Sequence, residues 1–177
     1  MKILGNVVLP IILVVAILFL IILIGSRQNH KGGQHYDEMQ LKIRASGYRI
    51  GFLVTLAGLF FLILLTEVVD SFSKLISPSF GMEIVGMTGI VVFVVYCIFK
   101  DAFYSIGENK KTYMLICVAV IICNGIGSVR FFAEGMPADG SPLSVSNSGN
   151  LIMGISFLII LIALIIKNAQ DRREAAE

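Results

Sequence analysis

Long runs of apolar residues set the strongest constraint on the fold of this chain. Residues 3–24 are 22 consecutive residues without a charge, and about 20 apolar residues suffice to cross the hydrocarbon of a bilayer. Four further apolar runs cover residues 50–66, 84–99, 113–129 and 151–166. Hydrophobic residues make up 56% of the chain, more than a soluble domain of this length needs. The sequence therefore predicts an all-α, single-domain integral membrane bundle of five transmembrane helices.

The first apolar run has to be distinguished from a secretory signal peptide. It is longer than the apolar core of such a signal, which is about 7–15 residues, and Gly25-Ser26-Arg27 offers no cleavage site of small residues. We therefore expect a retained helix. Pro10 either kinks this helix or lies near its true start.

The polar stretch 26–49 is expected to be a cytoplasmic linker that ends in an interfacial helix. Asp37 is a favourable N-cap, and Gln40 follows at the spacing of a capping box. Gly47 is a weak point where this helix could bend before the second apolar run. Small residues recur from there at helical spacing and predict a face that another helix can approach closely; they are Gly47, Gly51, Thr55 and Gly58.

The remaining connections are expected to be short or irregular. Residues 67–79 predict a loop with an amphipathic turn on the membrane surface, and residues 102–112 predict a polar turn. Residues 135–150 are rich in Gly, Pro and Ser and predict a loop without regular structure. Residues 167–177 predict a charged tail. In the third helix, Gly86 and Gly89 are expected on one side.

The distribution of lysine and arginine predicts the orientation. With five spans, eleven of these residues lie in the segments 26–49, 100–112 and 167–177 on one side of the membrane. Only three, Lys2, Lys74 and Arg130, lie on the other side. The positive-inside rule therefore predicts an N-terminus outside and a C-terminus in the cytoplasm.

Sequence motifs for catalysis are missing. There is no Walker loop, HExxH, GxSxG or GxGxxG. The three cysteines lie inside apolar runs and read as packing residues, and His30 and His35 have no acidic or thiol partners in a metal-ligand pattern. The net charge of +2 gives no reason to expect nucleic acid. We expect no enzymatic activity, no cofactor and no bound metal.

Charged residues gather at the predicted cytoplasmic boundary, and this group is the first candidate site. It is dense and built on helix ends, which favours contact with a protein partner. The candidate partner-contact residues are Asp37, Glu38, Arg44, Arg49, Lys100 and Asp101. Asp101 is expected to cap a helix or to pair within this group.

Two smaller polar groups complete the candidates. Asn124 and Ser128 share a face of the fourth helix, where they would form interhelical hydrogen bonds or line a path for a solute. At the outer boundary, Glu67 and Asp70 are candidates for an ion pair with Arg130, the alternative being independent solvated charges.

Several of these residues also carry a resemblance. Asp37-Glu38-Met39-Gln40 followed by Arg44 and Tyr48, and then Ile98-Phe99-Lys100-Asp101-Ala102-Phe103, resemble an uncharacterised family of small bacterial multi-pass membrane proteins. Members of that family carry a DExQ…RxxxY segment and an IxxDA-aromatic segment. The resemblance covers residues 36–130 and implies a multi-pass protein of the bacterial cell membrane, without an assigned activity.

Two hypotheses of function follow from the sequence. The first is a non-enzymatic accessory or regulatory subunit that binds a protein partner through helix faces and the cytoplasmic side. The association expected is with another membrane protein or, as in the alternative that follows, with further copies of the chain. The alternative is a component of a small-solute transporter or channel that acts as an oligomer. In both hypotheses the lipid bilayer is the surrounding medium.

Overall fold

The structure, a computed structural model, describes residues 36–69, 71–105, 108, 110–133 and 142–175; for four of them, Arg130, Phe131, Phe132 and Asn147, only the backbone is described. The first predicted helix, over residues 3–24, and most of the linker that follows it lie outside this part. Residues 36–177 belong to one unit of the chain, and the description below concerns that unit alone.

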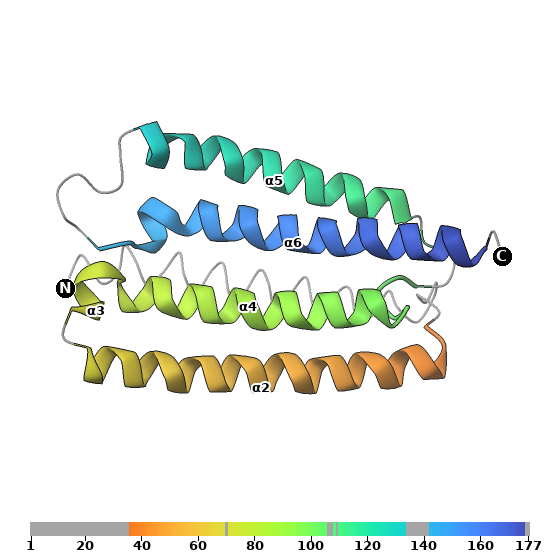
Figure 1. Cartoon of the computed structure of the whole chain (residues 1–177), viewed down its shortest axis with the longest axis horizontal. Coiled ribbons are helices and arrows are strands. Elements are labelled where there is room, and N and C mark those ends of the chain that lie inside the picture. Colours follow the sequence, from red (N-terminus) through yellow and green to blue (C-terminus); the bar gives the residue numbers. More distant parts are fainter. Residues whose placement is uncertain (1–35, 70, 106–107, 109, 134–141, 176–177) are drawn as a thin grey trace, which may run out of the picture. The chain divides into compact units, whose positions relative to one another are not determined.

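Helices form the regular structure of the described residues, which contain no strand. α2 spans Glu38–Val68, the short α3 spans Phe72–Leu75, α4 spans Pro78–Phe99, α5 spans Lys110–Ala133 and α6 spans Val145–Glu174 (Figure 1). Four of these helices, α2, α4, α5 and α6, are long and apolar enough to cross a membrane. The predicted all-α class is thus confirmed for this part of the chain, with four of the five predicted spans in view.

The predicted interfacial helix and the second apolar run form one continuous helix. Asp37 is the N-cap of α2, and its backbone N–H donates to Oε1 of Gln40 at 3.2 Å, as the capping box predicts. The helix continues through Gly47 without a break. Its 31 residues correspond to about 46 Å at 1.5 Å per residue, and a hydrocarbon core is about 30 Å thick. α2 is therefore longer than a crossing of the hydrocarbon requires.

Two predicted boundaries are wrong at α6. The segment 135–150 was expected to be a loop, but α6 already begins at Val145. The last helix was predicted to end at residue 166, before the charged tail 167–177, but α6 continues to Glu174. Hydropathy places a boundary at the first polar residue, whereas a helix begins at a suitable cap and continues through Lys, Gln, Arg and Glu, which all favour helix.

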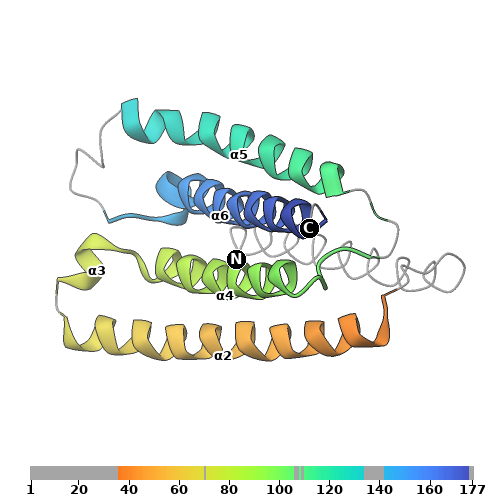
Figure 2. The same ribbon diagram turned by 45° about the vertical axis from the view of Figure 1, so that its right-hand side comes forward.

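The four long helices lie side by side in a single row. The extensive helix contacts are those of α2 with α4, α4 with α6, and α6 with α5. Figures 1 and 2 show this order from two directions, with α2 and α5 at the two edges. Within the described part of the chain, the helices therefore form an open layer and not a closed four-helix ring.

Glycines bring α2 and α4 into close contact. A Cβ added at Gly51 would lie 2.9 Å from the carbonyl oxygen of Gly89. A Cβ added at Gly89 would collide with Oγ1 of Thr55. Gly58 and Gly81 are covered by Val85 and Leu62 of the facing helix. The small-residue face predicted on α2 is thus the surface that receives α4.

Gly86 does not share the side of Gly89, contrary to the prediction. No described residue lies within 4 Å of a Cβ built at Gly86. The two glycines are three residues apart, which places them about 60° apart round the helix axis, and only Gly89 meets α2. Gly86 therefore faces an open side of α4.

The core lies between α4, α5 and α6. It is formed by buried side chains from all three helices, namely Ile98, Cys117, Ile160, Ala163 and Leu164. Ile98 lies near the C-terminal end of α4, so this core adjoins the polar site described below.

The linkers at the other end of the row are joined by main-chain hydrogen bonds. Ile76 and Leu143 form an isolated parallel β-bridge. The N–H of Ser77 donates to the carbonyl of Leu143 at 2.8 Å, and the N–H of Leu143 donates to the carbonyl of Leu75, also at 2.8 Å. These bonds fix the start of α4 against the segment that leads into α6.

The glycine contact predicts a specific sensitivity. Gly89→Leu would force a side chain into Thr55 and the α2 backbone, and we expect a loss of about 1–3 kcal/mol of stability, the usual range for overpacking. Gly125→Leu is the matched control, because no described residue lies within 4 Å of a Cβ at Gly125. Thermal unfolding followed by circular dichroism checks this, and equal melting temperatures for the two variants would contradict the packing described.

Candidate functional site

A left-handed turn ends α4 and forms the centre of a polar site. Asp101 has a φ of 57°, a conformation that glycine usually adopts at this position of a helix end. The N–H of Ala102 donates to the carbonyl of Cys97 at 2.9 Å, and the N–H of Asp101 donates to that of Ile98 at 3.3 Å. This is the hydrogen-bond pattern of a Schellman motif. Ala102 and Cys97 are completely buried beneath it.

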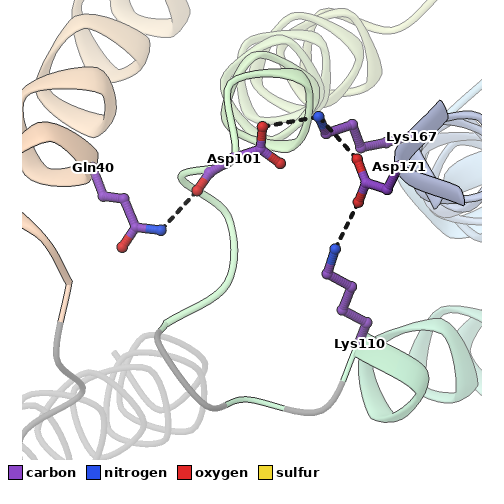
Figure 3. Close-up of polar contacts among 5 residues, drawn as sticks. All are labelled: Gln40, Asp101, Lys110, Lys167 and Asp171. Atoms are coloured by element: carbon purple, nitrogen blue, oxygen red, sulfur yellow. Dashed lines mark hydrogen bonds and ion pairs between the residues drawn. The ribbon is translucent and has the colours of Figure 1, made fainter. Parts of the chain in front are cut away.

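Two side chains of α2 bind the carbonyls of this turn. Nε2 of Gln40 donates to the carbonyl of Asp101 at 2.7 Å, and a guanidinium N–H of Arg44 donates to that of Ala102 at 3.1 Å (Figure 3 shows Gln40). The Arg44 guanidinium also lies 4.4 Å from the ring centroid of Tyr36. α2 thus satisfies carbonyl groups that the end of α4 leaves without intrahelical partners.

Ion pairs continue from the turn to α6 and α5. Nζ of Lys167 lies 2.8 Å from a carboxylate oxygen of Asp101 and 3.1 Å from one of Asp171. Nζ of Lys110 lies 2.7 Å from the other carboxylate oxygen of Asp171. Figure 3 shows these four side chains in a chain of alternating charge. Because Lys167 is only 15% exposed, water screens its contacts less than those of an ordinary surface pair.

An aromatic cluster stands beside the ion pairs. Phe103, Tyr104 and Tyr113 meet edge to face, with ring centroids 5.0–5.4 Å apart. The Tyr113 hydroxyl donates to a carboxylate oxygen of Glu108 at 2.6 Å, and the Ser105 N–H donates to the same oxygen at 3.1 Å. Burial raises the pKa of Tyr104 to about 12, with smaller contributions from Cys117 and Asp171. The phenol of Tyr104 therefore stays protonated at neutral pH.

The six residues predicted to contact a partner divide into two groups. Arg44 and Asp101 meet at the turn and bind within the chain, Arg44 through a carbonyl and Asp101 through Lys167. The other four are exposed on the surface at the same end of the row, namely Asp37, Glu38, Arg49 and Lys100. Asp101 thus pairs with a residue of α6 and not with the neighbouring basic residues considered from the sequence.

Asn124 and Ser128 bond to their own helix. Nδ2 of Asn124 donates to the carbonyl of Val120 at 2.8 Å, and Oγ of Ser128 donates to the carbonyl of Asn124 at 2.9 Å. Ser128 is buried, and Cβ of Asn124 lies close to Gly154 of α6. The two residues therefore belong to the α5–α6 contact, but the bonds seen are intrahelical and not the interhelical ones expected.

The ion pair predicted at the outer boundary involves residues that lie largely outside the described part of the chain. Glu67 is exposed in the last turn of α2. Asp70 and the side chain of Arg130 are not among the described groups. The pairing of these residues therefore stays a prediction.

Sequence reasoning missed several residues of the polar network. Lys110, Lys167 and Asp171 were treated as parts of a turn and of a tail. Lys167 and Asp171 are four residues apart, a spacing that signals a helical ion pair. Their approach to Asp101 could not be read from the sequence, because 66 positions separate Asp101 from Lys167.

A further residue that sequence reasoning missed is Glu83 of α4. The third apolar run predicted from the sequence begins at Ile84, so Glu83 fell outside the predicted helix. The structure begins α4 at Pro78. Oε2 of Glu83 is buried and has no hydrogen-bond partner among the described residues.

The described residues contain no group of three or more His, Cys, Asp or Glu side chains placed to hold a metal ion. Comparison with known protein families, with curated proteins and with solved structures found no match. The interpretation of the site therefore rests on its own geometry, which joins the ends of α2, α4, α5 and α6.

The ion pair at the turn can be tested with a double-mutant cycle. Asp101→Asn keeps a residue that tolerates the left-handed conformation, and Lys167→Met keeps the length of the side chain. We expect a coupling of about 0.5–1 kcal/mol between the two substitutions at low salt, and a smaller one at high salt. The control cycle pairs Asp101→Asn with Arg173→Gln and should be additive. Equal coupling in both cycles would contradict the pairing.

The raised pKa of Tyr104 predicts a late optical titration. The absorbance change of this phenolate should appear near pH 12, because ionisation must overcome burial. Tyr104→Phe should remove that component of the ultraviolet titration in detergent. If Tyr104→Phe removes a component of the titration at lower pH and leaves the component near pH 12, Tyr104 is not buried in this way.

Proposed function

We propose that this chain is an integral, multi-pass protein of the bacterial cell membrane and acts as a non-enzymatic accessory or regulatory subunit. It would bind another membrane protein through helix faces and through its cytoplasmic side. The observation that carries this proposal is the open row, in which α2 and α5 each pack extensively against one long helix among those described. Among the described helices, such a layer leaves two broad faces uncovered.

Packing physics supports a protein partner. Inside a bilayer, apolar side chains gain little by leaving lipid, so helices associate through close packing and polar contacts. In the row, glycines already serve the α2–α4 contact, and the exposed apolar residues of α2 and α5 include Phe60 and Ile126. An accessory subunit presents such preformed faces without a catalytic site.

The proposed orientation places the polar network in the cytoplasm. Lys42, Lys100, Lys110 and Arg172 all belong to the end of the row where α2 begins and α6 ends, and Lys74 belongs to the opposite end. This bias supports a cytoplasmic C-terminus through the positive-inside rule. With residues 3–24 as a fifth span, the N-terminus would be outside. The resemblance to bacterial multi-pass proteins supports the assignment to a bacterial membrane.

The alternative is a transporter or channel component. Its support is the polar and small face of α5 around Asn124, Gly127 and Ser128. An open row of helices encloses no path by itself, so this alternative requires several copies around a common pore.

Purification in native membrane discs tests the proposal. We expect a distinct membrane protein to accompany the chain at fixed stoichiometry, identified by native mass determination. The control is Asn124→Leu, which should leave that partner bound, because Asn124 bonds within its own helix. A homo-oligomer without any partner would contradict the accessory function. Solute flux in liposomes that Asn124→Leu abolishes would then favour the transporter.

A further inference from the structure

Glu83 is a carboxylate of the long apolar helix α4, and the ion pairs among the described residues do not include it. It is the sixth residue of α4, about 8 Å from the start of the helix at 1.5 Å per residue. Its two carboxylate oxygens lie 3.2 Å and 3.3 Å from the point where a Cβ on Gly149 of α6 would stand. Oε2 is buried without a hydrogen-bond partner among the described residues. Ionisable residues in such places are costly and are usually paired or functional.

At the opposite end of the α4–α6 contact, a carboxylate is paired with a cation of the same chain. There, Asp101 at the end of α4 meets Lys167 of α6 at 2.8 Å. The α4–α6 contact thus has a carboxylate near each of its ends. Asp101 is paired with a cation, and Glu83 has no cation partner among the described residues. The α6 position that Glu83 lies against is Gly149, which has no side chain and cannot supply a charge.

An open helix face lies next to Glu83. Met82 is 57% exposed and Ile90 is 53% exposed, and Gly86 lies between them at helical spacing. No described residue stands within 4 Å of a Cβ at Gly86. A glycine that faces outward lets the backbone of a second helix come close, and Glu83 lies one turn from it on the same helix.

We propose that Glu83 and Gly86 form the docking site for a transmembrane helix of another protein, which carries a lysine or arginine at the depth of Glu83. The partner helix packs on the face formed by Met82, Gly86 and Ile90, and its cation pairs with the Glu83 carboxylate. This inference rests on the proposed accessory function and adds the place of contact and the chemistry of the partner.

Charge complementarity selects this occupant. A lipid acyl chain would fill an apolar face but would leave the carboxylate unpaired. A divalent metal ion such as Ca²⁺ needs several oxygen ligands, whereas Glu83 belongs to no group of three or more acidic, His or Cys side chains among the described residues. A single basic side chain on a helix supplies one charge at one depth, which is what one carboxylate can bind.

Site-specific cross-linking in cells locates the partner. Met82 is replaced by the photo-reactive p-benzoylphenylalanine, and the same replacement at Thr88 is the control. Thr88 is exposed too, but lies roughly 120° round α4 from Met82. We expect an adduct from position 82 and at least tenfold less from position 88, with the captured peptide belonging to a transmembrane helix that contains Lys or Arg. Capture of residues 3–24 of this chain, or of lipid alone, would overturn the proposal.

Matched substitutions test the two parts of the site. Glu83→Gln keeps the shape of the side chain and removes the charge, and Glu67→Gln is the control at an exposed acid at the same end of the row. Gly86→Leu blocks the close approach, and Gly125→Leu is the control at an outward glycine of α5. We expect Glu83→Gln and Gly86→Leu to lower the adduct and the co-purified partner at least tenfold, and both controls to leave them unchanged.

The outcomes separate this inference from the accessory function itself. If the wild-type protein co-purifies with a partner, and the Glu83→Gln and Gly86→Leu variants bind that partner equally well, the docking site is wrong and the accessory function stands. If wild-type protein has no partner, both fail. Circular dichroism and elution volume show whether each variant folds. A charge exchange tests direct pairing: Glu83→Lys is made in this chain, and the captured basic residue of the partner is replaced by Glu. We expect the exchanged pair to form the complex again. If both variants fold and the complex does not form, direct pairing is excluded.

Discussion

The close approach of α2 to α4 depends on glycine, and the arrangement of the other helices follows from it. Inside a bilayer, larger apolar side chains would hold the two backbones apart without any gain over lipid. At Gly51 and Gly89 the backbones meet directly. α4 therefore receives α2 on one side and α6 on the other, which makes it a central member of the row and leaves Gly86 on an open face. A closed ring would have buried that face.

The two ends of the row of helices differ in how a carboxylate at the α4–α6 contact is paired. Asp101 closes α4 in a left-handed turn, and its charge is met by Lys167 within the chain. Gln40 and Arg44 bind the carbonyls of the same turn, so this end is held together by the molecule itself. Glu83 lacks such partners among the described residues. In the docking proposed above, one end stabilises the fold and the other is completed by a second protein.

Local sequence rules predicted the elements well and the connections between them poorly. The apolar runs located α4 and α5, and the capping box located the start of α2, because both signals lie within a few residues. Glu83 was placed outside its helix, because a hydropathy boundary stops at a charge whereas the Ser77 cap and Pro78 start the helix earlier. The pairing of Asp101 with Lys167 depends on the order of helices in the row, which no short segment encodes.

The open row is the central structural claim, and the distance between its edge helices tests it most directly. Spin labels at Leu53→Cys in α2 and Ile122→Cys in α5, with the exposed Cys123 replaced by Ser, would be measured by pulsed dipolar spectroscopy in discs. Three successive helix spacings of about 8–10 Å each predict a separation of roughly 24–30 Å between the two helix axes. A separation near one spacing, about 10 Å, would show that α2 and α5 close a ring, and would contradict the account.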